Sequence, residues 1–265
     1  MNSKTNNDYW PLPKNDPWST PFAETLLSVI DLFPGASVLD IAAGGGIPSF
    51  YIAEEVGPTG KVLGIDLHPG QIQRAKTVQG YRVPWLEFMH GDMKRLPQNL
   101  PSFDRITGNL SFMFFRPDRL SALKDVLKFL KPGGQIALSF PSLGTFDPLW
   151  SRIDKEMKKH NLTKEREALE DYRLERPSSE HVKNWLEELN MDRIQIKEEP
   201  LKIESNSGQE FLYHPLLRNG FLEDAYECFE DQKLAATVMN SVSNDMESFT
   251  PLLAIRCAFS AWKKS

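Results

Sequence analysis

Cysteine is scarce in this chain of 265 residues, which contains only Cys228 and Cys257, far apart in the sequence. Two such thiols suggest neither a disulfide framework nor a thiolate metal site, so we expect both to be small buried side chains. None of the five histidines has the paired spacing of a zinc-binding motif. The sequence therefore predicts no metal site.

Long hydrophobic runs and an excess of positive charge are also missing. No segment reaches the roughly 18 uninterrupted apolar residues of a membrane span. The polar residues 1–7 lack the apolar centre of a signal peptide. These absences predict a cytoplasmic protein without a membrane span. The formal net charge of −5 argues against nucleic acid as the main partner.

A glycine-rich turn follows a short apolar run near the start of the chain. Val38–Ile41 is typical of a strand, and Gly44–Gly46 follow it closely. Glycine accepts positive φ angles and lets a ligand approach the backbone. Ile47–Val56 then has helical spacing, and Lys61–Asp66 is a second apolar run that ends on a carboxylate. This order predicts one βαβ unit of a nucleotide-binding α/β sheet.

The same alternation of strands and helices continues to about residue 140. Residues 1–20 are rich in proline and aromatics and predict an extended arm. The elements expected after this arm are a helix at Pro21–Phe33, strands at Trp85–Met89 and Phe103–Asn109, a helix at Leu120–Leu130, a turn at Lys131–Gly134 and a strand at Gln135–Phe140. Strands that alternate with helices predict a doubly wound, mostly parallel sheet.

The rhythm changes beyond Pro141, where the chain becomes charged and helical in pattern. We expect a core at 21–142 that is completed by a helix and strand within 178–204 and by a final strand within 250–265. The segments 143–177 and 205–249 are then helical insertions that can form a lid. Their many aromatic side chains favour an apolar pocket or the core of a helical cap.

With these residues in hand, the chain resembles the class I S-adenosylmethionine-dependent methyltransferases, most nearly those that act on small molecules. Val38 to Gly46 is similar to the first motif of that family, with Ala42 where the family usually has a glycine. The resemblance implies a Rossmann-like sheet of about seven strands, the last one antiparallel. It also implies S-adenosyl-L-methionine as cofactor and S-adenosyl-L-homocysteine as product.

The family pattern assigns cofactor-binding roles to residues at the ends of successive strands. Asp66 would bind both ribose hydroxyls, because an ionised carboxylate accepts two hydrogen bonds. Leu67 would lie against the adenine ring, and Asp92 would accept from the adenine amino group beside Met93. The remaining expected cofactor contacts are Asp40, Ala42, Gly44, Gly46, Asn109 and Leu110.

The absence of certain motifs restricts the class of molecule that could accept the methyl group. The chain has neither the Asn-Pro-Pro-Tyr of amino-methylating enzymes nor the Pro-Cys of cytosine methylation, so we expect a small organic acceptor. Apolar and aromatic residues in the insertions favour an apolar or aromatic one. The candidate substrate contacts are Trp18, Ser111, Trp150 and Tyr213. The candidate bases are His214, Tyr213, Tyr172 and His68, although side chains of these types are more often packing or surface residues.

Two other functions share the glycine turn. One is a relative that binds the cofactor without turnover, as a sensor or scaffold. The other is an NAD-linked oxidoreductase, whose fingerprint Gly-x-Gly-x-x-Gly would need glycine at Ser49. Asp40 beside the turn also disfavours a pyrophosphate and suits a ligand that carries positive charge.

Overall fold

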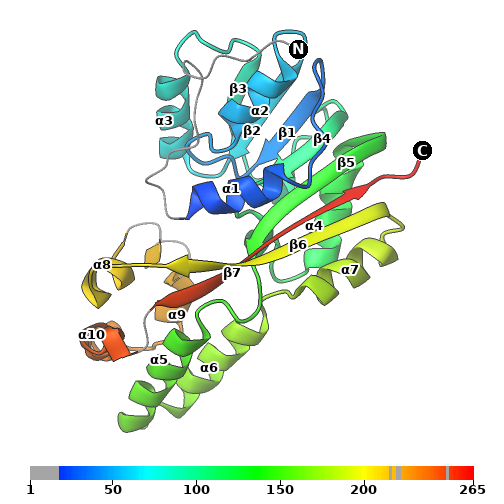
Figure 1. The fold of residues 1–265 in the computed structure, drawn as a ribbon. Coiled ribbons are helices and arrows are strands. Elements are labelled where there is room, and N and C mark those ends of the chain that lie inside the picture. Colours follow the sequence, from blue (N-terminus) through cyan, green and yellow to red (C-terminus); the bar gives the residue numbers. More distant parts are fainter. Residues whose placement is uncertain (1–17, 215–216, 219–221, 249–250) are drawn as a thin grey trace. The chain divides into compact units, whose positions relative to one another are not determined.

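The computed structural model describes residues 18–214, 217–218, 222–248 and 251–265 (Figure 1). These residues form two compact units. The first unit contains the described chain up to Phe140 together with Ser179–Glu198 and Arg256–Ser265. The second contains Pro141–Ser178 and Glu199–Ile255. Most of the predicted arm, residues 1–17, lies outside the described residues.

The described strands form one sheet in the order β3-β2-β1-β4-β5-β7-β6. The strands are β1 (Ser37–Ile41), β2 (Lys61–Asp66), β3 (Leu86–His90), β4 (Phe103–Gly108), β5 (Leu130–Pro141), β6 (Asp192–Ile203) and β7 (Leu252–Trp262). The first five pair in parallel and the last are antiparallel. This arrangement confirms the predicted Rossmann-like sheet. The strand order reverses at β1, which lies between β2 and β4, and ligands bind at such a switch point.

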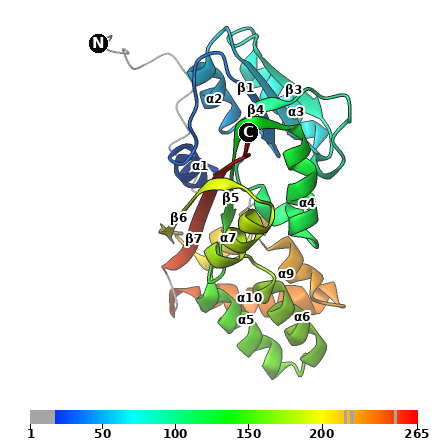
Figure 2. The same cartoon turned by 90° about the vertical axis from the view of Figure 1, so that its right-hand side faces the viewer.

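Helices cover both faces of the sheet in the first unit (Figures 1 and 2). Alternate residues of a strand point to opposite faces, so Leu39 and Ile41 join one core cluster with α4 and α7. Val38 joins the cluster on the other face, with α2 and α3. The helix α1 packs on β5 and β7 through Leu26, and Val29 just after the helix joins the same cluster. The helix bounds are α1 (Ser19–Leu27), α2 (Ser49–Val56), α3 (Pro69–Gln79), α4 (Arg119–Val126) and α7 (Ser179–Glu188).

The helix α1 ends at Leu27, six residues before the predicted end at Phe33. A side chain from β5 accounts for the difference. Gln135 donates from Nε2 to the carbonyl of Val29 at 3.0 Å and accepts from the Asp31 N–H at 2.8 Å. These long-range bonds satisfy backbone groups that a continuing helix would otherwise pair, and no local pattern encodes them.

The strand β5 begins at Leu130, so the predicted turn at Lys131–Gly134 lies inside its bounds. The pairing with β4 shifts register there, from Phe103 with Leu130 to Arg105 with Gln135. The extra residues pair elsewhere, since Lys263 after β7 exchanges backbone hydrogen bonds with Gly133 and Gly134 at 2.9 Å. The predicted helix over 120–130 accordingly stops earlier, as α4 followed by the 3₁₀ turn η3 (Leu127–Phe129).

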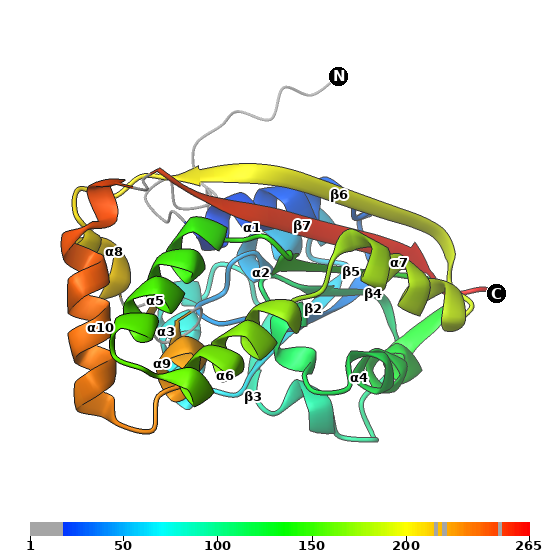
Figure 3. The same ribbon diagram turned by 90° about the horizontal axis from the view of Figure 1, so that it is seen from below.

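The second unit is mainly helical, as Figure 3 shows for α5, α6 and α10. Its helices are α5 (Asp147–Lys159), α6 (Thr163–Leu174), α8 (Gly208–Leu212), α9 (Glu223–Glu227) and α10 (Gln232–Asn244), with the 3₁₀ turn η5 (Met246–Ser248). In the part of the chain that the structure describes, no helix is long and apolar enough to cross a membrane. The role of this unit as a lid stays a prediction.

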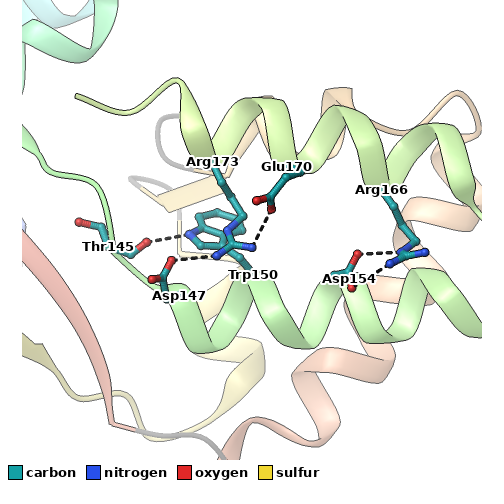
Figure 4. A network of polar contacts seen from close by, with 7 residues as sticks. All are labelled: Thr145, Asp147, Trp150, Asp154, Arg166, Glu170 and Arg173. Atoms are coloured by element: carbon teal, nitrogen blue, oxygen red, sulfur yellow. Dashed lines mark hydrogen bonds and ion pairs between the residues drawn. The ribbon is translucent and has the colours of Figure 1, made fainter. Parts of the chain in front are cut away.

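Polar contacts fasten α5 to α6 (Figure 4). Arg166 forms a two-pronged ion pair with Asp154, at 2.7 Å from Nε and 3.3 Å from Nη2. Arg173 bridges Glu170 on its own helix and Asp147 at the start of α5. Bidentate arginine pairs fix geometry more firmly than single contacts. These pairs therefore hold the two helices in one register.

The close contact between Gly64 of β2 and Phe88 of β3 yields a stability prediction. A Cβ at Gly64 would lie 2.7 Å from Phe88 Cδ1 and 3.1 Å from the Cβ of Ala43. We expect Gly64→Ala to lower the free energy of unfolding by about 1–3 kcal/mol, because overpacking forces neighbours to move. Urea unfolding measures the change.

The matched control for this substitution is Gly70→Ala in α3, where a Cβ meets nothing within 4 Å. We expect this variant to be as stable as the parent or up to about 1 kcal/mol more stable, since alanine favours a helix over glycine. Equal stability of the Gly64→Ala protein and the parent would show that the β2–β3 contact is looser than described.

Candidate functional site

The glycine-rich turn follows β1 and has a left-handed backbone at several positions. The φ angles are +53° at Gly44 and +97° at Gly46. A Cβ at Gly46 would lie 2.3 Å from Phe50 Cε2, whereas one at Gly44 would meet nothing within 4 Å. Gly46 is therefore needed for packing, and Gly44 leaves open space. Ala42 also has positive φ, +52°, a backbone conformation that glycine adopts with less strain than alanine.

The carboxylate of Asp66, at the end of β2, joins two strand-end loops. Its Oδ2 accepts from the Gly44 N–H and its Oδ1 accepts from the His68 N–H, both at 2.8 Å. The side chain is almost buried, at 8% exposure. Each carboxylate oxygen can accept a second hydrogen bond. Asp66 thus positions the turn and keeps acceptor capacity for a ligand.

An exposed apolar side chain follows this carboxylate directly. Leu67 is 58% exposed, and its carbonyl lies 2.9 Å from the ring Nε2 of His90 at the end of β3. His90 thereby fixes the backbone of Leu67, a role that sequence reasoning missed. His90 lies opposite Asp66 in the pairing of β2 with β3. Only that pairing could have indicated its contact with Leu67.

Asp92 and Met93 come next on the β3 side. Asp92 is half-buried and caps the 3₁₀ turn η1 (Met93–Arg95) by accepting from the Lys94 N–H at 2.9 Å. Met93 is partly buried against the core cluster beneath the sheet. Both lie at the carboxyl edge, as predicted from strand order, and their contacts with a cofactor stay a prediction.

Asp40 of β1 is fully buried, without an adjacent cation among the described contacts. Its two oxygens accept from the Ser49 hydroxyl at the start of α2 and from the Thr107 hydroxyl of β4, the latter at 2.8 Å. Burial raises the pKa of Asp40 to about 6, although both hydrogen bonds oppose the shift. This carboxylate links three elements under the glycine turn. Its predicted contact with a cofactor stays a prediction.

The loop after β4 is held by a chain of hydrogen bonds. Asn109 accepts from the Ser139 hydroxyl at 2.7 Å and donates to the carbonyl of Ser19 in α1 at 2.8 Å. Ser139 in turn accepts from the N–H of Leu110, whose φ is +52°. Ser111 is fully buried and donates to the carbonyl of Gly108 at 2.9 Å. The sequence indicated this loop but not Ser139, its main anchor.

The candidate catalytic and substrate residues are dispersed between the two units. Three lie in the first unit: His68 is exposed at the cap of α3, Trp18 is buried beside α1, and Ser111 is buried in the loop after β4. The other four lie in the second unit: Trp150 is buried and donates to the Thr145 carbonyl, Tyr172 accepts from Arg176, Tyr213 donates to Asn240, and the buried Nδ1 of His214 has no hydrogen-bond partner. Their roles stay predictions.

The residues of the first unit fit an adenosyl group. Gly44 offers open space beside its backbone, Asp66 offers acceptors for hydroxyls, and Leu67 offers an exposed apolar surface for a base. Within the described residues, no group of histidine, cysteine or carboxylate side chains could hold a metal ion. The donor set is therefore one for a polar organic ligand with an aromatic base.

The buried carboxylate of Asp40 yields a pH prediction. Because its pKa is about 6 in the folded protein and 3.8 when unperturbed, the folded state binds the proton more tightly than the unfolded state. Asp40 therefore lowers the free energy of unfolding as pH rises from about 4 to about 6, by about 3 kcal/mol in all. Asp40→Asn should remove this loss.

Urea unfolding of both proteins across this pH range measures the effect. The free energy of the parent minus that of the Asp40→Asn variant should fall with rising pH. Gly70→Ala, which changes no titratable group, is the control and should give a flat difference. A flat difference for Asp40→Asn would contradict the burial of an ionised carboxylate.

Comparison with known families and sequences gives several matches. Residues 38–134 match the family described as methyltransferase domain. Demethylmenaquinone methyltransferase of Staphylococcus aureus is 30% identical over 174 residues, which covers 62% of this chain and 70% of that protein. Aklanonic acid methyltransferase of a Streptomyces species is 37% identical over 132 residues, or 48% of this chain and 59% of that protein.

Demethylmenaquinone methyltransferase of Lactococcus lactis is 36% identical over 115 residues, or 43% of this chain and 45% of that protein. The chain thus spans about half the length of the last two relatives. Among solved structures, phosphoethanolamine N-methyltransferase 2 of Haemonchus contortus with S-adenosylhomocysteine has a TM-score of 0.57 at 14% identity, and covers 92% of this chain and 52% of that one.

The YcgJ protein of Bacillus subtilis has a TM-score of 0.53 at 18% identity, over 92% of this chain and 98% of that one. At such identities these two structures establish the fold alone. The sequence matches, the family domain and the reversal of strand order beside the glycine turn agree with one another. This chain belongs to the class I S-adenosylmethionine-dependent methyltransferases.

Proposed function

We propose that this protein transfers a methyl group from S-adenosyl-L-methionine to a small apolar or aromatic acceptor and releases S-adenosyl-L-homocysteine. The observation that carries the proposal is the bridge from Asp66 to the glycine turn at Gly44, beside the exposed Leu67. This geometry provides acceptors for a ribose diol and an apolar face for a base at the switch point of the sheet.

In this proposal, residues at the carboxyl edge of the sheet contact different parts of the cofactor. Asp66 binds the ribose hydroxyls, Leu67 and Met93 contact the adenine, and Asp92 accepts from its amino group. The backbone from Ala42 to Gly46 lies along the methionine part, with Asn109 and Leu110 at its far side. The buried charge of Asp40 favours a ligand with an ammonium and a sulfonium over an anionic one.

Adenosylmethionine supplies an activated methyl group on a positively charged sulfur. The protein then has to align an acceptor with that methyl and keep water out. Hydrogen bonds hold the loop at Asn109–Ser111 in place. In the proposal this loop forms a rigid side of the site that aligns the acceptor with the methyl group. A general base is needed only for an acceptor that loses a proton, and His68, Tyr172, Tyr213 and His214 remain the candidates.

Two findings support an aromatic acceptor. The relatives at 30% identity or more include enzymes named for demethylmenaquinone, for 2-phytyl-1,4-beta-naphthoquinone and for aklanonic acid. The second unit buries Phe146, Trp150, Phe211, Tyr226 and Phe229. In the proposal this unit acts as the lid that encloses the acceptor, with Trp18, Ser111, Trp150 and Tyr213 as contacts.

The competing dinucleotide function has less support. Ser49 occupies the position of the third glycine of the NAD fingerprint, and its hydroxyl donates to Asp40. The buried carboxylate of Asp40 lies beneath the turn, where it would repel a pyrophosphate. Asp66 does not separate the two cofactors, because NAD-binding sheets also carry an acid at this strand end for the ribose. A binding protein without turnover is distinguished by product formation alone.

Thermal unfolding with separate additions of adenosylmethionine, adenosylhomocysteine and NAD tests the cofactor. A ligand at about 100 times its dissociation constant adds roughly 2.7 kcal/mol to stability. We expect both adenosyl ligands to raise the midpoint and NAD to leave it unchanged. A rise with NAD alone would overturn the proposed function.

A substitution at Asp66 tests the ribose assignment. We expect Asp66→Ala to bind adenosylhomocysteine about 10- to 150-fold more weakly, because charged hydrogen bonds contribute about 1.5–3 kcal/mol. Calorimetry measures the affinity, and the exposed Asp125→Asn serves as the control that keeps it. Equal affinity of Asp66→Ala and the parent would mean that the ribose lies elsewhere.

A further inference from the structure

A cluster of donors in the second unit has no role in the cofactor site. It consists of Tyr213 at the end of α8, Arg218 in the following segment, Tyr226 in α9 and Asn240 in α10. The guanidinium carbon of Arg218 lies 3.5 Å from the ring centroid of Tyr226. The Tyr213 hydroxyl donates to Asn240 Oδ1 at 2.7 Å.

The hydroxyl of Tyr226 is buried, and the residue is only 6% exposed. Its one hydrogen-bonding neighbour among the described residues is the Tyr213 hydroxyl, whose geometry falls short of an ordinary hydrogen bond. A phenol hydroxyl that leaves water without a new partner costs free energy, so such groups are rare unless a ligand or ordered water satisfies them. Burial, and then the neighbouring Tyr213, raise the pKa of Tyr226 to about 12, while Arg218 lowers it. Tyr226 is therefore a neutral donor at physiological pH.

Arg218 is half-buried and has no carboxylate at ion-pair distance among the residues that the structure describes. Its backbone is fixed, because its N–H donates to the His214 carbonyl at 2.8 Å. A guanidinium that stacks on an aromatic ring still has N–H donors at its edge. The buried apolar side chains along the same segments are Leu212, Leu217, Leu222 and Phe229.

We propose that Arg218 and Tyr226 form a binding site for an anionic oxygen, a carboxylate or a phenolate, carried on an aromatic molecule. Arg218 supplies the charge, the Tyr226 hydroxyl supplies a neutral donor, and the surrounding apolar side chains accommodate the ring. The bound molecule would be the methyl acceptor of the proposed function. That identification rests on the proposed function, whereas the binding site itself does not.

The test titrates the full chain, saturated with adenosylhomocysteine, with 1-naphthoate at about pH 7.5 and follows binding by calorimetry. Matched titrations use 1-naphthol and the neutral 1-naphthalenemethanol. We expect 1-naphthoate to bind at least about tenfold more tightly than the neutral alcohol, as a charge-assisted contact requires. 1-Naphthol is mostly neutral at this pH, so tighter binding of 1-naphthol than of 1-naphthoate would overturn the proposal. Equal binding of 1-naphthoate and the neutral alcohol would overturn it as well.

Variants locate the site. Arg218→Gln should weaken 1-naphthoate binding about 10- to 100-fold, and Tyr226→Phe about fivefold. The controls are Arg166→Gln, which breaks a surface pair in the same unit, and Tyr81→Phe, at a fully exposed tyrosine. Both controls should keep the parent affinity within twofold. Parent affinity in Arg218→Gln and Tyr226→Phe would refute the site.

Thermal unfolding separates binding from folding. Tyr226→Phe removes a buried hydroxyl whose contact with Tyr213 falls short of an ordinary hydrogen bond, so its midpoint should equal or exceed that of the parent. A lower midpoint would mean that the hydroxyl is structurally paired, which contradicts the proposal. If 1-naphthoate binds but adenosylhomocysteine does not stabilise the protein, the proposed function is refuted and this site stands. If adenosylhomocysteine stabilises the protein but 1-naphthoate does not bind, this site alone is refuted.

Discussion

The shape of the glycine turn depends on a carboxylate from a different strand. Gly44 is fixed by Asp66, and the same carboxylate also fixes the backbone of His68 at the start of α3. The turn after β1 and the loop after β2 are therefore one hydrogen-bonded structure. Because parallel strands place their carboxyl ends at one edge, a single side chain can join them. The candidate cofactor site rests on this connection.

Beneath the turn, Asp40 is stabilised without a neighbouring cation. It accepts two hydroxyl hydrogen bonds, from α2 and from β4, and they offset only part of the cost of burial, since its pKa remains raised. Leucine or valine would fill a core position more stably. The retention of a carboxylate here is consistent with the proposed positively charged ligand, whose field would favour the ionised form.

Sequence reasoning located the parallel strands and the acids at their ends, because both follow from local alternation and from strand order. It failed where a distant side chain decides local structure, as Gln135 does for the end of α1. It also missed Ser139 and His90, whose partners come from other strands. The candidate bases could not be selected, because burial and hydrogen bonding depend on packing that no spacing encodes.

The double task of Asp66 contrasts with the single task of its neighbour. Replacing Asp66 would disturb the turn as well as any ligand, whereas the side chain of Leu67 is 58% exposed and only its backbone carbonyl is used, by His90. Within the proposed function, Leu67 is therefore the position where a substitution can change which cofactor base is accepted without disturbing the turn. Shortening it would admit synthetic cofactors with an enlarged base at little expense to the scaffold, which offers a route to selective labelling of the product.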